Sequence, residues 1–63
     1  MNKRTRLRQI REQRGVPIGL LAQHLNISFR VLLSIERNKK SLEPNQIRQI
    51  CTYFDIRVID LFE

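Results

Sequence analysis

The stretch LLAQHLNISFRVLLSIERN, residues 20–38, constrains the fold of this chain more than any other part of it. Its apolar residues recur at helical spacing in two groups, which are Leu21, Ala22 and Leu25, and then Leu32 and Ile35. The first group predicts a helix over about residues 17–25, and the second predicts a helix over residues 28–37. Both helices carry one apolar face, so both need to cover the same core.

The residues between these helices fit a sharp turn. Asn26 tolerates positive φ better than most residues that bear a side chain. Ser28 can cap the free N–H groups of the second helix, an effect worth about 1 kcal/mol. Ala22 is small enough to let a crossing helix approach, and Asn38 suits a left-handed helix end. Together these residues predict a helix-turn-helix.

Length and composition limit the class of protein. A chain of 63 residues corresponds to one domain, residues 1–63, near the lower size for a core without disulfides or metal. The chain opens with Met1 and ends just after an apolar pair, which favours a complete small protein. Its single cysteine, Cys51, excludes an intramolecular disulfide, so we expect a reducing, cytoplasmic setting. No apolar run approaches the roughly 20 residues of a membrane span, and no signal peptide is recognisable.

Charge is distributed unevenly along the chain. Acidic residues outnumber basic ones only from Glu43 onward, and before it the basic residues are Lys3, Arg4, Arg6, Arg8, Arg11, Arg14, Arg30, Arg37, Lys39 and Lys40. Phosphate backbones, acidic proteins and anionic membranes could all bind such a surface. A membrane is the least suitable, because the basic residues do not share one long amphipathic helix.

The remaining segments predict three further helices and no strand. We expect a first helix over residues 3–14 that ends at Gly15, and Pro17 fits the first position of the second helix. Pro44 fits the start of a fourth helix that Asp55 ends. Their core positions are expected to be Leu7, Ile10, Ile47, Ile50, Cys51 and Phe54, and a short fifth helix carries Val58, Leu61 and Phe62. The predicted fold is an all-α, five-helix domain.

A collinear set of short motifs runs along this framework. The motifs are Leu7-Arg8-Gln9-Ile10-Arg11-Glu12-Gln13-Arg14-Gly15, Leu21-Ala22, Ile27-Ser28, Ile35-Glu36-Arg37, and Tyr53-Phe54-Asp55-Ile56 through Leu61-Phe62. With them the chain resembles the Cro and phage-repressor type of helix-turn-helix domain, also called the XRE type. The resemblance implies a bundle that binds operator DNA, usually as a dimer, with the third helix in the major groove.

The resemblance also implies a structural ion pair. Arg11 and Glu36 match a pair that joins the first helix to the third in this family. Helical geometry independently places Glu36 beside Leu32 and Ile35, where an unpaired carboxylate would be costly. The alternative is that both charges are solvated at the surface.

Candidate DNA contacts lie on and just after the third helix. On a helical wheel Arg30, Ser34 and Arg37 point away from the core. The resemblance implies that bases are read at Phe29, Arg30, Leu33 and Ser34, and we add the neighbouring Ser28 to this set. Arg30 suits a bidentate contact with guanine, and Phe29 could pack on thymine methyl groups. The residues expected at phosphates are Arg37, Asn38 through its backbone N–H, Lys39 and Lys40. The alternatives are that Arg30 contacts only phosphate or is a solvated charge, and that the two lysines merely solvate the loop.

Three features depart from the family pattern. Pro17 and Ile18 replace a capping residue and a phosphate-binding Gln, and Glu43-Pro44 shift the family's proline. Phe29 and Leu33 are apolar for a face that reads polar base edges. Ile18, Phe29 and Leu33 could form an exposed apolar patch. The alternative function is therefore a protein-interaction module, such as an antirepressor or a partner of another regulator.

Catalysis is not indicated. His24 is isolated and expected at the surface, and Cys51 fits a small core residue. The chain has no carboxylate pair, Cys/His cluster or glycine-rich phosphate loop. We expect that the protein is not an enzyme and that it binds neither a metal nor a cofactor. The sequence predicts a sequence-specific DNA-binding transcriptional regulator, a repressor that occupies a short symmetric operator as a homodimer.

Overall fold

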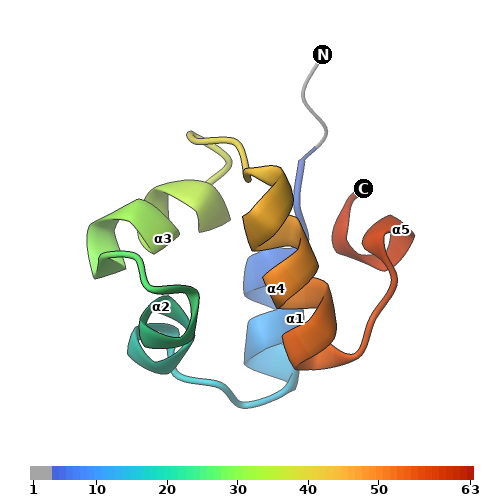
Figure 1. The fold of residues 1–63 in the computed structure, drawn as a ribbon, viewed down its shortest axis with the longest axis horizontal. Helices are drawn as coiled ribbons and strands as arrows, with labels where there is room; N and C mark the ends of the chain where they lie inside the picture. The colour runs from blue at the N-terminus through green and yellow to red at the C-terminus, as the bar shows by residue number, and fades with distance from the viewer. Residues whose placement is uncertain (1–3) are drawn as a thin grey trace.

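The computed structural model describes residues 4–63, which form five helices. They are α1 (Leu7–Gln13), α2 (Ile18–Leu25), α3 (Phe29–Glu36), α4 (Pro44–Phe54) and α5 (Val58–Leu61). In Figure 1, α1 and α4 occupy the middle of the molecule, α2 and α3 lie on one side, and α5 lies on the other. The all-α, five-helix prediction is confirmed.

The turn between α2 and α3 has the geometry of a helix-turn-helix. The two helices are bent by 107° relative to each other, within the range typical of this motif. The Ser28 hydroxyl caps α3 by accepting a hydrogen bond from the Val31 N–H at 3.2 Å. Ile27 N–H donates to the Ala22 carbonyl at 3.0 Å, which closes the end of α2.

Four helices end with a residue in the left-handed region. At each end a backbone N–H donates to a carbonyl five residues earlier, as from Lys39 to Ser34 at 2.9 Å. The left-handed residues are Gly15 (φ 67), Asn26 (φ 56), Asn38 (φ 60) and Asp55 (φ 55). Glycine, asparagine and aspartate are the residues that adopt this conformation at least cost. The predicted helix ends are therefore confirmed.

One core lies beneath all five helices. Its buried apolar residues are Leu7, Leu21, Ala22, Leu25, Leu32, Ile35, Ile50, Phe54 and Leu61. Ile10, Ile47, Cys51 and Phe62 pack against this core but are only partly buried. Val58 begins α5 as predicted, but it is 53% exposed and does not fill the core. A helix of four residues presents little more than one turn, and Leu61 alone fills the core from it.

The predicted start of the first helix was wrong. α1 begins at Leu7, and residue 3 lies outside the described residues. Thr5 instead forms an isolated antiparallel bridge with Phe62, with Arg6 N–H donating to the Leu61 carbonyl at 2.7 Å. These backbone hydrogen bonds compete with a first helical turn, and a β-branched threonine favours the extended form. Pro17 likewise lies one position earlier than predicted, at the extended N-cap of α2.

Side chains also join helices that are far apart in sequence. The Arg14 guanidinium donates to the Phe54 carbonyl at 2.9 Å and lies 5.9 Å from the centre of the Phe54 ring. This contact fixes the end of α1 against the end of α4. Within the described residues no single helix is long and apolar enough to span a membrane, and only the bent pair of α2 and α3 reaches that length.

Candidate nucleic-acid interface

The first turn of α3 is the most accessible part of that helix. Arg30 is exposed, the Phe29 side chain is 51% exposed, and Ser28 at the N-cap is exposed as well. Leu33 and Ser34 are partly buried. For Ser34 this differs from the outward direction predicted by the helical wheel. The loop after α3 folds back there, since Lys39 N–H donates to the Ser34 carbonyl.

A buried ion pair fixes the orientation of α3. Arg11 Nε lies 2.7 Å from one carboxylate oxygen of Glu36, and Arg11 Nη2 lies 3.1 Å from the other. The side chains are only 12% and 2% exposed, so the pair is not a surface contact. The hydrogen bond to Glu36 raises the pKa of Arg11, with burial acting in the opposite direction. A bidentate pair of this kind sets both distance and angle between α1 and α3.

Arg11 also connects the start of α2 to this pair. Its Nη1 donates to the Val16 carbonyl at 2.9 Å, just before α2 begins. One guanidinium thus holds α1, the segment leading into α2, and α3 together. The ion pair implied by the resemblance is present, and its third contact was not predicted.

An apolar hollow opens beside the exposed turn of α3. Its volume is about 230 Å³, and it is lined by Ile18 from α2, Phe29 and Leu33 from α3, the exposed Arg8 and Arg37, and the Arg11–Glu36 pair. The structure therefore brings together the three residues of the predicted apolar patch. Two arginines flank them, so the patch is both apolar and positively charged at its edge.

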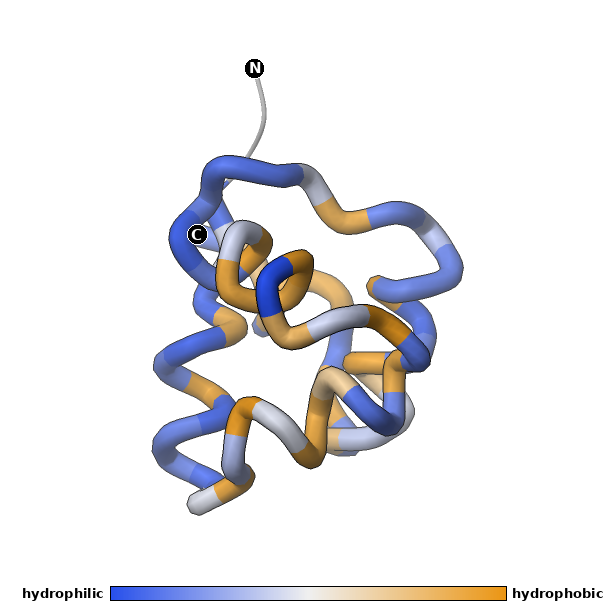
Figure 2. The backbone as a smooth tube through the Cα atoms, turned by 90° about the vertical axis from the view of Figure 1, so that its left-hand side faces the viewer, coloured by the Kyte–Doolittle hydropathy of each residue, from blue (hydrophilic) through white to orange (hydrophobic). Residues whose placement is uncertain are grey.

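The loop after α3 presents the other basic candidates. Arg37, Lys39 and Lys40 are exposed, and the loop crosses the top of Figure 2 as a largely hydrophilic stretch. The backbone N–H of Asn38 does not have the role predicted for it. Its backbone N–H already donates to the Ile35 carbonyl at 3.0 Å, so this group is not free for a phosphate.

The side chain of Asn38 has a partner that the sequence did not reveal. Its Oδ1 accepts a hydrogen bond from the Thr5 N–H at 2.7 Å. This contact brings the N-terminal segment to the end of α3 and completes a polar hollow of about 510 Å³. Thr5 and Asn38 are 33 residues apart, so no local sequence pattern could have shown this contact.

The residues with chemistry outside this interface are dispersed. The His24 ring is exposed and packs on Tyr53, with ring centres 4.5 Å apart. Burial raises the pKa of the partly buried Cys51 thiol, and the charge of Asp60 adds to this effect. Among residues 4–63, no group of three or more His, Cys, Asp or Glu residues is placed to hold a metal ion.

Comparisons with known proteins agree with this geometry. A family model described as helix-turn-helix matches residues 7–61, from the first residue of α1 to the last of α5. Among solved structures, the clp gene regulator ClgR from C. glutamicum is similar, with a TM-score of 0.75 and 28% sequence identity. The match covers 86% of this chain and 70% of that one. No curated protein matches the sequence.

Proposed function

Because this chain belongs to the XRE-type helix-turn-helix family and is a DNA-binding regulator of transcription, we propose that it is a repressor acting by operator occupancy. In this proposal α3 enters the major groove of double-stranded DNA. The observation that carries it is the exposed first turn of α3, held rigidly by the buried Arg11–Glu36 pair. Base reading requires such a fixed orientation, because side chains must meet particular base edges.

We assign base reading to the exposed side chains at the start of α3. Arg30 forms a bidentate contact with guanine, and Phe29 packs on a thymine methyl group. Ser28 remains able to donate its hydroxyl proton while its oxygen caps α3. Leu33 and Ser34 are less accessible and contribute at the edge of the contact.

Phosphate contacts are assigned to the basic residues around this turn. Arg37, Lys39 and Lys40 are exposed at the end of α3 and in the loop that follows. Asn38 positions the two lysines, because its left-handed backbone and its bond to Thr5 fix the start of the loop. Such contacts set affinity and register and carry no sequence information.

A homodimer on DNA is supported by the other side of the molecule. Val58 and Ile59 on α5 are 53% and 73% exposed, which is unusual for large aliphatic side chains in succession. Beside them a hollow of about 540 Å³ is lined by Ile47, Cys51 and Ile56 among others. Because α5 and α3 lie on opposite sides of α4 in Figure 1, a second copy on α5 leaves both α3 helices free.

The test is selection of binding sites from randomised duplexes, followed by titration of the variants. Arg30→Ala should lose about 1–3 kcal/mol at one base pair and bind all bases there alike. Lys39→Ala with Lys40→Ala should weaken binding to every sequence equally. Arg48→Ala, on α4, serves as the control for lost positive charge. Weak binding that is indifferent to sequence, even at low salt, would reject the repressor proposal.

The apolar hollow favours a second candidate function. Phe29, Leu33 and Ile18 between Arg8 and Arg37 suit an apolar side chain on an acidic protein segment. If the face binds protein, Phe29→Ala should abolish that complex and leave DNA affinity and its salt dependence unchanged. If the face reads DNA, the same variant loses affinity only at sites that carry a particular base.

A further inference from the structure

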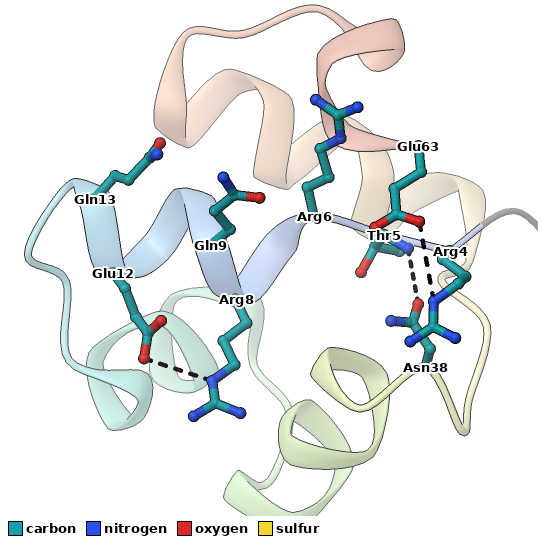
Figure 3. A pocket seen from close by; sticks show the side chains of 9 residues that line it. All are labelled: Arg4, Thr5, Arg6, Arg8, Gln9, Glu12, Gln13, Asn38 and Glu63. Atoms are coloured by element: carbon teal, nitrogen blue, oxygen red, sulfur yellow. Dashed lines mark hydrogen bonds and ion pairs between the residues drawn. The ribbon is translucent and has the colours of Figure 1, made fainter.

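The polar hollow beside the N-terminal segment is separate from the α3 surface that we assign to base reading. Figure 3 shows its lining: Arg4, Thr5, Arg6, Arg8, Gln9, Glu12, Gln13, Asn38 and Glu63. Three arginines face two carboxylates there, so the hollow has an excess of positive charge. Two glutamines and one asparagine add neutral groups that can donate hydrogen bonds.

This hollow adjoins the proposed DNA-binding face at two points. Arg8 lines it and also lines the apolar hollow that contains Phe29 and Leu33. Asn38 lines it as well, directly before the exposed Lys39 and Lys40. The hydrogen bond from Thr5 N–H to Asn38 holds the N-terminal segment against this corner at 2.7 Å.

The arginines of the segment point in different directions. In Figure 3 the Arg4 side chain lies beside Asn38, and Arg8 is directed toward the side of α2 and α3. Arg6 is directed the other way, toward α5. The pKa of Asp60 on α5 is lowered chiefly by its hydrogen bond with Arg57, and the charge of Arg6 contributes to the same direction.

The carboxylates in the hollow hold their arginines only weakly. Arg4 Nε lies 4.0 Å from Glu63, with side chains 71% and 57% exposed. Arg8 Nε lies 3.5 Å from Glu12, with side chains 65% and 56% exposed. Exposed pairs with this geometry contribute little to stability. An arginine can therefore exchange such a carboxylate for a phosphate at small cost, and the bidentate Arg–phosphate contact is stronger.

We propose that this hollow is a second phosphate site, in which Arg4 and Arg8 bind the DNA backbone flanking the α3 contact while Glu63 competes for Arg4. The inference rests on the proposed function, because it takes duplex DNA as the partner. The second phosphate site would extend the DNA interface from α3 and the loop after it to the N-terminal segment, which is hydrogen-bonded to Asn38. Glu63 then limits affinity, since the Arg4–Glu63 pair must open before phosphate binds.

The experiment uses fluorescence anisotropy with a mixed-sequence duplex of about 20 base pairs, roughly two helical turns, over a series of KCl concentrations. A phosphate contact is independent of sequence, so no operator is needed. Arg4→Gln should lower affinity roughly two- to tenfold and reduce the salt slope by about 0.9. Glu63→Gln should raise affinity and steepen the slope, a gain that a folding defect would not produce.

Arg6→Gln is the matched control, because it removes the same charge from the same segment on the side facing α5. Equal losses for Arg4→Gln and Arg6→Gln, with no gain for Glu63→Gln, would overturn the phosphate site while the proposed function stands. A wild-type protein that does not bind duplex DNA in a salt-dependent way would reject the proposed function itself. A selective loss at Arg4 together with a gain at Glu63 supports the site.

Discussion

The two sides of this molecule are stabilised in different ways. On the side of α2 and α3, polar groups that are far apart in sequence are joined, as Arg11 is to Glu36 and Thr5 to Asn38. On the side of α4 and α5, the long-range contacts end on backbone carbonyls, as from Arg14 to Phe54 and from Arg6 N–H to Leu61, and the side-chain caps are local. Glu43 N–H donates to Gln46 at 2.9 Å, and Arg57 N–H donates to Asp60 at 3.1 Å.

The surfaces of the two sides differ in the same sense. The side that contains α3 exposes arginines and lysines beside Leu20 and Phe29, whereas α5 exposes two adjacent aliphatic residues, Val58 and Ile59. Directional polar contacts fix the orientation of a helix, which base reading requires. Apolar burial is non-directional and suits a protein surface that a second chain covers. The contrast is consistent with the proposal that one side holds α3 at a fixed angle for DNA and the other side receives a second copy of the chain.

The largest expected effect comes from removing the buried Arg11–Glu36 ion pair, which joins α1 to α3. Arg11→Ala leaves the Glu36 carboxylate buried and unpaired, at a cost of about 3 kcal/mol. For a domain of this size each kcal/mol lowers Tm by about 4–8 °C. Thermal unfolding followed by circular dichroism should therefore show a large decrease in Tm. Arg8→Ala, whose partner Glu12 is exposed, should change Tm little.

A double variant tests whether the loss arises from the stranded charge. Arg11→Met combined with Glu36→Leu removes both charges and keeps apolar volume in the core, so it should recover much of the lost stability. Its DNA affinity should remain reduced if the bidentate geometry is what orients α3. Equal Tm values for Arg11→Ala and Arg8→Ala would contradict the difference drawn between the two sides.

The features that the sequence predicted correctly are those with local causes. Asn26 and Asn38 end helices because of their own backbone preference, and Ser28 caps the helix that follows it. The buried faces of α2 and α3 follow from helical spacing alone. Family resemblance supplied the Arg11–Glu36 pair, because no local pattern joins residues 25 positions apart.

The features that were missed depend on contacts between distant segments. Residues 4–6 were expected to be helical, but their backbone pairs with residues 61–63 at the other end of the chain. The side chain of Asn38 is bonded to Thr5, so the polar hollow could not be seen in either segment. The roles of individual α3 residues toward DNA remain predictions, because base reading depends on a partner that folding does not require.

The second prediction concerns the apolar surface of α5. Ile59→Lys should abolish self-association, because a charge on a side chain that is 73% exposed in one copy would be buried by the second. The free energy of unfolding of the single chain should change by less than about 0.5 kcal/mol. Sedimentation velocity measures the association, and Leu20→Lys on α2 is the control, since Leu20 is also exposed. An equal loss of self-association in both variants would show that α5 is not the surface through which two copies associate.

The smallest effect concerns the local cap of α5. The Asp60 carboxylate accepts hydrogen bonds from the Arg57 side chain and from the Arg57 backbone N–H. These bonds lower the pKa of Asp60 below its ordinary value. A carboxylate with a lowered folded-state pKa contributes stability above its unfolded pKa, and this contribution disappears as the pH falls through the folded-state pKa. Asp60→Asn should therefore be slightly less stable than wild type at neutral pH. The difference should begin to fall below about pH 4, near the ordinary pKa of aspartate, and should disappear once the pH is below the lowered folded-state pKa.

Thermal unfolding of both proteins between neutral and acidic pH measures this difference. Because the carboxylate is exposed and its partner Arg57 is 82% exposed, the shift in Tm should be far smaller than that of Arg11→Ala. Salt should reduce it further, since exposed charges are screened. A pH-independent difference would show that Asp60 acts through its backbone cap alone. A difference as large as that of Arg11→Ala would mean that α5 is held by polar contacts as firmly as α3.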